Sequence, residues 1–251
     1  AFADALSERT RWVALGAASN AIGTVNDVAG LAGMAREAGA RVFVDAVHYA
    51  PHGRIDVTAL GIDALGCSPY KFYGPHAGVL FVGAELQEAL DVPRLVCAGS
   101  EPPEVLETGT LSHESILGSA AAVDFLASLG DGTDRRSRLD HAFRTLHQRG
   151  EELVSRLWDG LAGIPGVRLY GPPPGLPRTP TVGFTVEGHT SEAVTAELSS
   201  RYGIFSSHGD FYATTVIEDL GVAPDGLVRV GCACYTTEEE VDRLVTGVAS
   251  L

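Results

Sequence analysis

The first 83 residues contain four short apolar runs, and a segment with helical periodicity lies between the first two runs. The runs have the length of strands and span residues 11–19, 41–45, 63–68 and 78–83. Residues 27–40 repeat apolar side chains at helical spacing, with Asp27 as the candidate N-cap, and 56–62 predicts a short helical turn. Strand, helix and strand, with apolar strands throughout, predict βαβ units and a parallel-rich α/β sheet covered on both faces.

The pattern changes after Pro102 and Pro103. Helical segments are predicted at 112–130 and 134–163, and the chain's densest Pro and Gly punctuation follows at 164–180. The remainder predicts a compact α+β unit with strands at 181–188 and 227–235 and helices at 191–203 and 236–251. Thr236 and Glu239 fit a capping box at the start of the last helix. We therefore expect two domains, residues 1–163 and residues 164–251.

Composition narrows the classes of protein that fit. Hydrophobic residues make up 45% of the 251 residues, which suffices for a real core. The net charge of −14 argues against a nucleic-acid or anionic-membrane partner. No apolar run reaches the roughly 20 residues that span a bilayer, and the start lacks the pattern of a secretory signal. We expect a cytoplasmic protein without nucleic-acid or membrane partners.

The four cysteines are too few for a disulfide framework in a chain of this length, so we expect reduced thiols. Cys232 and Cys234 lie two positions apart in a predicted strand. A metal site needs further ligands at fixed spacing, and none are nearby in the sequence. We therefore expect no bound metal.

Two charged residues follow neighbouring predicted strands. Asp45 ends the run 41–45, and Lys71 follows the run 63–68, flanked by Tyr70 and Phe72 in a Gly- and Pro-rich loop. Ligands of open α/β sheets bind at the carboxyl ends of the strands, so both side chains would lie at one edge. An amine there can form a Schiff base with an aldehyde, and a carboxylate can hold a pyridinium proton. A structural ion pair is the alternative, and an apolar loop would lower the lysine's pKa.

Five motifs occur in order along nearly the whole chain. They are SNAIGTVNDV (19–28), VDAVHYAPHGRIDVTALGIDAL (44–65), SPYKFYGPHAGVLFV (68–82), ETGTLSHES (107–115) and GLVRVGCACYTTEEEVDRL (226–244). Together they resemble the class V aminotransferase family, in particular its cysteine-desulfurase-like branch. The resemblance implies the fold of pyridoxal 5'-phosphate (PLP) dependent transferases of fold type I. Residues 1–163 would be the C-terminal portion of the large PLP-binding domain, and 164–251 the small C-terminal domain.

The resemblance also implies roles for residues around the cofactor ring. Lys71 matches the Schiff-base lysine, and Asp45 matches the acid that pairs with the pyridine nitrogen. His48 matches the position that hydrogen-bonds the ring hydroxyl, where many relatives have Gln and where an imidazole can also donate. Asn20 matches an asparagine near that hydroxyl and the substrate carboxylate. Lys71, Asp45 and His48 are the implied catalytic residues.

Other matches concern the phosphate and the substrate. Ser68 matches a phosphate ligand, and Gly109 and Thr110 match a pair that reaches the phosphate of the partner subunit, which implies a homodimer. Arg229 matches the arginine that holds the substrate α-carboxylate, a task that suits its bidentate fork. A surface salt bridge is the alternative interpretation of Arg229.

One departure from the family lies in the small domain. Desulfurases attack the substrate sulfur with a loop cysteine, but residues 203–221 contain none, and its position falls near Phe211 or Tyr212. Cys232 and Cys234 lie beyond Arg229, so a persulfide mechanism through this loop is disfavoured. The same loop carries polar groups that could exchange protons or simply pack. These polar groups are His208, Asp210 and Tyr212. Of the three, His208 and Tyr212 are our candidate substrate contacts.

A second departure is that the glycine-rich phosphate cradle and the ring-stacking residue of the family are not recognisable. We therefore expect the C-terminal part of a longer protein, or only its ordered portion, which by itself would bind PLP weakly. The favoured activity is PLP-dependent β-elimination from a cysteine-like amino acid, as a C–S lyase or desulfurase-like enzyme in which Lys71 moves the α-proton. Aminotransferase, epimerase and non-catalytic scaffold remain alternatives. A nucleotide-binding domain lacks its G-x-G-x-x-G motif.

Overall fold

The structure is a computed structural model that describes residues 1–107 and 109–251. Its contacts divide the chain into two compact units, residues 1–17 with 27–142 and residues 18–26 with 143–251. Helix α6 (Arg135–Ala162) contributes its first turns to one unit and the rest to the other. The sequence-based division after residue 163 falls at the end of this helix, because Pro and Gly mark loops whereas a continuous helix shows no internal boundary. That division stays a prediction about independently folding domains.

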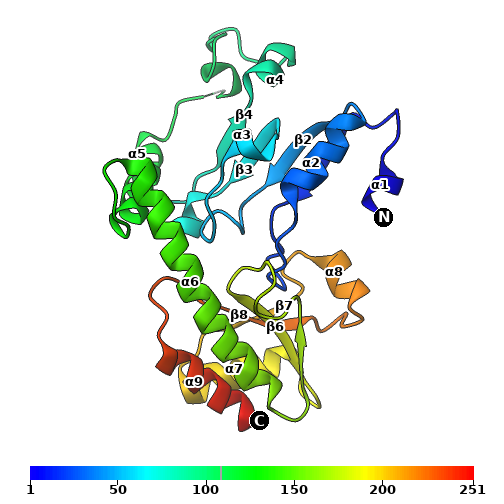
Figure 1. Cartoon of the computed structure of the whole chain (residues 1–251), viewed down its shortest axis with the longest axis vertical. Helices are drawn as coiled ribbons and strands as arrows, with labels where there is room; N and C mark the ends of the chain where they lie inside the picture. The colour runs from blue at the N-terminus through cyan, green and yellow to red at the C-terminus, as the bar shows by residue number, and fades with distance from the viewer. Residues whose placement is uncertain (108) are drawn as a thin grey trace. The chain divides into compact units, whose positions relative to one another are not determined.

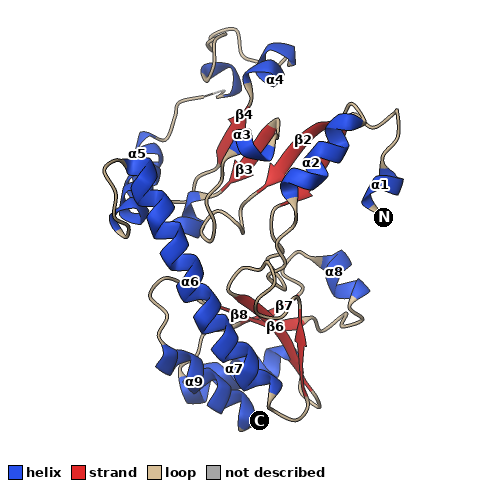
Figure 2. Cartoon of the chain, viewed as in Figure 1, coloured by secondary structure: helices blue, strands red, loops and turns tan. Residues whose placement is uncertain are grey.

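The first unit is built on a four-stranded sheet with the order β1 (Trp12–Gly16), β2 (Arg41–Asp45), β3 (Ala64–Cys67) and β4 (Val79–Val82). Strands β1, β2 and β3 are parallel, and β4 is antiparallel to β3. Figure 2 labels β2, β3 and β4 among the strands drawn in red. Helix α2 (Val28–Glu37) connects β1 to β2, and the Asp27 side chain caps it by accepting a hydrogen bond from the Gly30 amide at 3.0 Å. The predicted parallel-rich sheet and this N-cap are confirmed.

The core of the first unit lies between α2 and one face of the sheet. Val42 and Val44 of β2 pack in one cluster with Ala32 and Ala35 of α2. The prediction that the sheet is covered on both faces is wrong for β1 in the described residues, where Val13 is buried and Leu15 half-buried, while Trp12 on the other face is 49% exposed. A continuous apolar run does not distinguish a strand buried on both faces from an edge strand with one exposed face.

The smaller elements of this unit lie between and after the strands. They are α1 (Phe2–Ala5), α3 (Val57–Leu60), the 3₁₀ turns η1 (Pro69–Phe72) and η2 (Glu104–Leu106), α4 (Ala84–Ala89) and α5 (His113–Ser128). The helical turn predicted over 56–62 is confirmed as α3, which begins after Asp56. The Asp56 carboxylate caps it by accepting hydrogen bonds from the Thr58 and Ala59 amides.

The second unit is an antiparallel sheet covered by helices. The strand order is β5 (Val167–Tyr170), β6 (Thr181–Val186), β8 (Leu227–Gly231) and β7 (Ser207–Gly209). The helices are α7 (Ser191–Tyr202), α8 (Thr214–Asp219) and α9 (Glu238–Ala249), which Figure 1 labels. Apolar side chains of α6, α7 and α9 pack on β6 and β8 in one cluster. Its members include Leu153, Leu157, Phe184, Leu198, Val228 and Leu244.

The N-cap of helix α9 lies one residue later than the sequence predicts. The capping box joins Thr237 and Glu240, not Thr236 and Glu239. Both threonines are followed by a glutamate three positions on, so the pattern alone does not choose between them. The choice agrees with the turn before the helix, in which the Thr236 hydroxyl accepts a hydrogen bond from the Ala233 amide.

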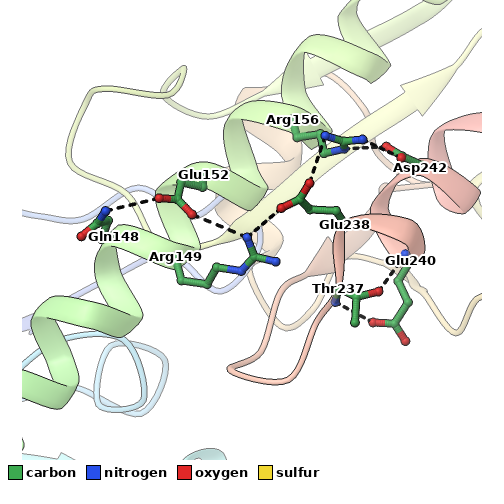
Figure 3. Close-up of polar contacts among 8 residues, drawn as sticks. All are labelled: Gln148, Arg149, Glu152, Arg156, Thr237, Glu238, Glu240 and Asp242. Carbon is green, nitrogen blue, oxygen red and sulfur yellow. Dashed lines mark hydrogen bonds and ion pairs between the residues drawn. The ribbon is translucent and has the colours of Figure 1, made fainter. Parts of the chain in front are cut away.

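Charged side chains connect α6 to α9 on the surface of the second unit (Figure 3). The Arg156 guanidinium donates from Nε and Nη2 to the two Asp242 oxygens, both at 2.6 Å. Arg149 and Arg156 share Glu238 at 3.1 and 3.3 Å. The bidentate geometry fixes the relative orientation of these side chains more strictly than a single surface ion pair would. Dissolved salt still weakens the attraction between their exposed charges.

Within the described ranges, no helix is both long enough and apolar enough to span a membrane.

Candidate active site

The first group of candidate residues lies at the carboxyl edge of the sheet in the first unit. Asp45 is the last residue of the inner strand β2, and its neighbours in register are Gly16 of β1 and Gly66 of β3. Lys71 lies in η1, which begins two residues after β3 ends. Because β2 and β3 are parallel, Asp45 and Lys71 follow their strands at the same edge, as expected.

Asp45 is exposed at this edge. Its Oδ1 accepts a hydrogen bond from the Val47 amide at 2.9 Å, which orients the carboxylate. The glycine at position 16 leaves the neighbouring strand end without a side chain, and a Cβ there would meet no atom within 4 Å. No side chain of residue 16 therefore crowds the carboxylate.

Lys71 is exposed, so the apolar loop expected from its aromatic neighbours does not desolvate it. Its Nζ lies 5.3 Å from the centroid of the Tyr70 ring, a cation–π contact. The Tyr70 ring in turn stacks on His76, with centroids 4.9 Å apart. Lys71 is also the only lysine in the chain, and every other residue with a permanently cationic side chain is arginine. An amine retained at this one position suits chemistry that a guanidinium cannot perform.

His48 and Ser68 follow the same two strands. His48 lies in the turn after β2, and its ring meets that of His52 edge to face, with centroids 5.4 Å apart. Ser68 is the N-cap residue of η1, but its side chain makes no capping hydrogen bond. Both side chains are therefore placed near the carboxyl edge, where a ring hydroxyl and a phosphate would need partners.

Gly109 and Thr110 are exposed in the segment between η2 and α5. Thr108 of the same motif lies outside the described residues. In the described part of the chain, nothing lies within 4 Å of a Cβ built on Gly109. Their implied contact with the phosphate of a partner subunit stays a prediction.

The second group of candidate residues lies in the second unit, where residues 18–26 run along the sheet. Gly183 of β6 makes this approach possible, since a Cβ there would lie only 2.9 Å from the Ala21 carbonyl oxygen. Asn20 belongs to this segment, and Arg229 pairs in register with Gly183. Alternation along β8 turns Arg229 away from the core-facing Val228.

Three residues of the second unit contact one another. Arg229 Nη1 donates a hydrogen bond to the Asn20 backbone oxygen at 3.0 Å, and Asn20 Nδ2 donates to the Phe211 backbone oxygen at 2.9 Å. The guanidinium carbon of Arg229 lies 4.2 Å from the centroid of the Phe211 ring. The structure thus brings Asn20 and Arg229 together, as a shared role at a substrate carboxylate requires.

The charge of Arg229 is not neutralised within the chain. The residue is half-buried, and this burial lowers the pKa of its guanidinium below its usual value. An arginine still stays protonated at neutral pH. No carboxylate of residues 1–107 or 109–251 pairs with it, so the surface salt bridge considered above is absent there. A half-buried cation without a counter-ion favours binding of an anion.

The loop that replaces the desulfurase cysteine loop has an unusual backbone. Phe211 and Tyr212 adopt left-handed φ angles of 57° and 59°, which costs about 1–3 kcal/mol for each non-glycine residue. Asp210 supports this turn, since its carboxylate accepts from the Tyr212 amide and the Thr214 hydroxyl, both at 3.1 Å. These contacts favour the loop-packing interpretation of Asp210. Tyr212, which is 101% exposed, has no such packing role.

His208 differs from the other candidates of the second unit. It pairs in register with Val228 on β8, and directly paired residues project from the same face of a sheet. Arg229 follows Val228 and projects from the opposite face. A substrate contact of His208 therefore stays a prediction that this geometry does not support.

Cys232 is buried, and burial raises the pKa of its thiol to about 11. The thiolate is the reactive form of cysteine, so this residue is a poor nucleophile at neutral pH. Across the described ranges, no three His, Cys, Asp or Glu side chains are grouped to hold a metal ion.

Sequence reasoning missed Phe211 as a contact of Arg229 and Asn20. It named Phe211 only as a position near the missing cysteine. The available signal was local, because Gly209 and Asp210 before two aromatic residues predict a turn. The contact with Asn20 joins residues 191 positions apart, which no local pattern reports.

Comparison with known proteins agrees with this fold. The model of the aminotransferase class-V family matches residues 1–244. The chain belongs to this family, whose members depend on PLP. It is 32% identical over 250 residues to the aminotransferase-like protein FGM3 of Gibberella zeae, covering 97% of this chain and 60% of that protein. It is also 32% identical to a cysteine desulfurase of Dickeya dadantii, covering 97% of this chain and 58% of that protein.

Solved structures show the same fold. The cysteine desulfurase CsdA of Escherichia coli has a TM-score of 0.83 at 29% identity and covers 98% of this chain and 60% of its own. An apo cysteine desulfurase of Thermococcus onnurineus has a TM-score of 0.84 at 27% identity, covering 96% and 59%. The predicted α/β fold of type I is confirmed. The chain spans about three fifths of the length of the relatives it matches.

The residues at the sheet edge fit PLP in their chemistry. An amine, a carboxylate, an imidazole and a hydroxyl follow two adjacent parallel strands, in Lys71, Asp45, His48 and Ser68. These groups suit the aldehyde, the ring nitrogen, the ring hydroxyl and the phosphate of the cofactor. Gly16, the neighbour of Asp45 on β1, places no side chain beside this carboxylate.

Proposed function

We propose that this chain is part of a PLP-dependent enzyme that acts on an amino acid and breaks its β-carbon–sulfur bond. The observation that carries the proposal is the arrangement of Asp45 and Lys71 after adjacent parallel strands. Family membership supports the cofactor, and similarity to cysteine desulfurases supports a cysteine-like substrate.

In this proposal, four residues of the first unit hold the cofactor. The Lys71 amine binds its aldehyde carbon, and the Asp45 carboxylate keeps a proton on its ring nitrogen. His48 donates a hydrogen bond to the ring hydroxyl, and Ser68 donates one to the phosphate. When bound, PLP supplies an electron sink for negative charge at the substrate α-carbon. The role of Asp45 as the proton-holding group fits its exposed edge position and its oriented carboxylate.

Residues of the second unit receive the substrate carboxylate. Arg229 presents an uncompensated, half-buried charge, and Asn20 contacts it directly. The amine of Lys71 then removes the α-proton as general base and returns protons as general acid. Tyr212 is an exposed proton donor in the loop near the expected nucleophile position, where it is available to the leaving group.

The reaction we favour is β-elimination. L-cysteine and water would give pyruvate, ammonia and hydrogen sulfide, with the sulfur leaving as the C–S bond breaks. No persulfide on an enzyme cysteine is needed for this outcome. The absence of cysteine from residues 203–221 and the burial of Cys232 both support it over transfer of sulfur to a loop thiol.

Transamination and epimerisation use the same residues at the cofactor ring. Both reactions remain alternatives within the family. They differ from each other only in the carbon, or the face of the carbon, to which the proton returns. A non-catalytic scaffold is the alternative of a different class. Two finer parts of the proposal are a homodimer, in which Gly109 and Thr110 would reach the partner's phosphate, and a cytoplasmic location.

The test combines a spectrum with product analysis. The purified chain is mixed with PLP, and its visible spectrum is recorded before and after borohydride reduction, followed by peptide mapping. We expect a pyridoxyl adduct on Lys71, and sulfide and pyruvate in equal amounts from L-cysteine. Lys71→Arg is the matched control, since it keeps the positive charge and removes the amine.

The product identifies the reaction. Alanine with sulfane sulfur would contradict elimination in favour of a desulfurase, and a keto acid with pyridoxamine phosphate would indicate transamination. If neither this chain nor a longer version carrying the remaining length of its relatives shows an adduct on Lys71, the cofactor role of Lys71 is wrong.

A further inference from the structure

We propose that Phe211 is a positioning residue for the carboxylate site, which it builds by stacking its ring on the guanidinium of Arg229. The inference rests on the proposed function in one respect, namely that Arg229 receives the α-carboxylate of an amino acid. It goes further by assigning the orientation of that arginine to a residue of the loop that lacks the desulfurase cysteine.

The first argument is the geometry of the stack. The Arg229 guanidinium carbon lies 4.2 Å from the Phe211 ring centroid. Phe211 is itself fixed, because it packs against a cluster around the buried Tyr170, Ile217 and Leu227. A ring anchored in this way limits the rotation of the guanidinium that it contacts.

The second argument is which N–H groups the stack leaves available. A cation above an aromatic face keeps its N–H groups in the guanidinium plane, where they can still donate. Nη1 donates to the Asn20 backbone oxygen. Among the residues that the structure describes, none accepts a hydrogen bond from Nε or Nη2. These two donors form one side of the fork, which matches the two oxygens of a carboxylate.

The third argument is the backbone of the loop. Phe211 has a φ of 57°, a conformation that bulky residues rarely adopt. The same residue accepts the Asn20 side-chain hydrogen bond through its backbone oxygen at 2.9 Å. Asp210 holds the turn by accepting from the Tyr212 amide. The strained turn therefore delivers both the ring to Arg229 and a carbonyl to Asn20, and strain of this kind gathers at functional sites.

The experiment reads out Arg229 directly. The full chain is labelled with ¹³C,¹⁵N-arginine in the presence of PLP, and the Arg229 side-chain resonances are assigned with Arg229→Lys. L-alanine and L-alaninamide are then titrated in turn. The wild-type chain should show a shift of the Arg229 resonances with L-alanine, whose carboxylate is ionised, and no such shift with the amide.

Variants separate the ring from the backbone. Phe211→Leu keeps the backbone carbonyl and removes the ring, so it should abolish the ring-current shift of Arg229 and weaken L-alanine binding about tenfold. Phe211→Tyr should restore both. Phe211→Met is a second ring-free variant, should the leucine variant fail to fold. Phe205→Leu is the matched control, since Phe205 is a nearby phenylalanine that is 91% exposed, and it should behave as the wild type.

The outcomes separate this inference from the proposed function. If L-alanine shifts Arg229 in the wild type but Phe211→Leu or Phe211→Met changes neither the shift nor the affinity, the positioning role is overturned and the carboxylate role stands. If L-alanine leaves Arg229 unchanged in the wild type, Arg229 does not receive the carboxylate, and both ideas are overturned.

Discussion

The Asp45 carboxylate accepts a hydrogen bond from the Val47 amide through Oδ1 at 2.9 Å, and in the described ranges Oδ2 has no such partner. Asp45→Asn keeps a carbonyl oxygen for Val47 but cannot hold a proton on a pyridine nitrogen as an anion does. We expect unchanged thermal stability and a fall in kcat on the order of 10²-fold, the scale of a lost acid–base contribution. Differential scanning calorimetry and steady-state kinetics on one preparation measure both.

Asp56→Asn serves as the control, because the Asp56 carboxylate also accepts hydrogen bonds from nearby backbone amides, as the N-cap residue of α3. It should leave kcat unchanged. Equal loss of activity in the two variants would mean that Asp45 acts through the fold and not through its charge.

Lys71 is the sole lysine, so only its side chain and the chain's terminal amine can react with an amine reagent at neutral pH. We predict that acetic anhydride modifies Lys71 readily in the chain without cofactor, because the residue is exposed. Saturating PLP should protect Lys71 and leave the terminal amine reactive. Mass spectrometry of the two peptides reports each rate. Equal labelling of Lys71 with and without PLP would contradict its role in holding the cofactor.

The elements of the first unit are largely predictable because their signals are local. Asp27 precedes an apolar period of helical spacing, and β2 has the predicted bounds of 41–45. The same logic fails for β5, whose four residues lie inside the Pro- and Gly-rich stretch, and for β7, which has only three residues, Ser207–Gly209. Such short strands exist because a neighbouring strand pairs with them, and their own sequence carries little signal.

The residues of the candidate site also divide into those that local sequence signals predict and those that they do not. Asp45 and Lys71 follow strands, so their shared edge could be predicted from the chain direction of β2 and β3. The stack of Phe211 on Arg229 could not, because it depends on the left-handed backbone of the loop and on the position of β8. Physical reasoning from a sequence reaches what periodicity encodes and misses contacts set by tertiary structure.

Arg229→Lys keeps the charge but loses the planar fork and most of the stacking surface. We expect KM for the amino acid to rise about 10- to 100-fold, the range for hydrogen bonds to charged groups, with a smaller change in kcat. Arg229→Gln should raise KM further, because it also removes the charge. Arg201→Lys is the control, since Arg201 pairs with Glu197 on the surface of α7. A lysine variant with wild-type KM would show that the fork is not used.

The burial of the His52 ring should make the stability of the fold depend on pH. Burial lowers its pKa from 6.5 to about 4, so the folded state holds a neutral ring where the unfolded state is protonated. Between these values the unfolded state binds more protons, so the free energy of unfolding falls as pH drops from about 6.5 to 4. His52→Phe should flatten this part of the curve, measured as denaturation midpoints in urea. An unchanged slope would mean that other groups cause the loss.

Substitution of Arg178 should change the stability of the fold, because its contacts are structural. It is 4% exposed, and it donates hydrogen bonds to the backbone oxygens of Pro172, Thr179 and Thr181, while its guanidinium lies 4.9 Å from the Trp158 ring centroid. Arg178→Met would remove one donor from each of these carbonyls, although the Thr179 oxygen keeps the Thr181 amide as a donor, and we expect a loss of about 3 kcal/mol in stability. Arg178→Lys should recover only part of this, because one ammonium cannot reach three separated acceptors as a planar guanidinium does. Urea midpoints followed by the fluorescence of Trp158, with Trp12→Phe as background, report the second unit. A methionine variant as stable as its parent would show that water satisfies those carbonyls, and that the arginine does not hold the 172–181 segment in place.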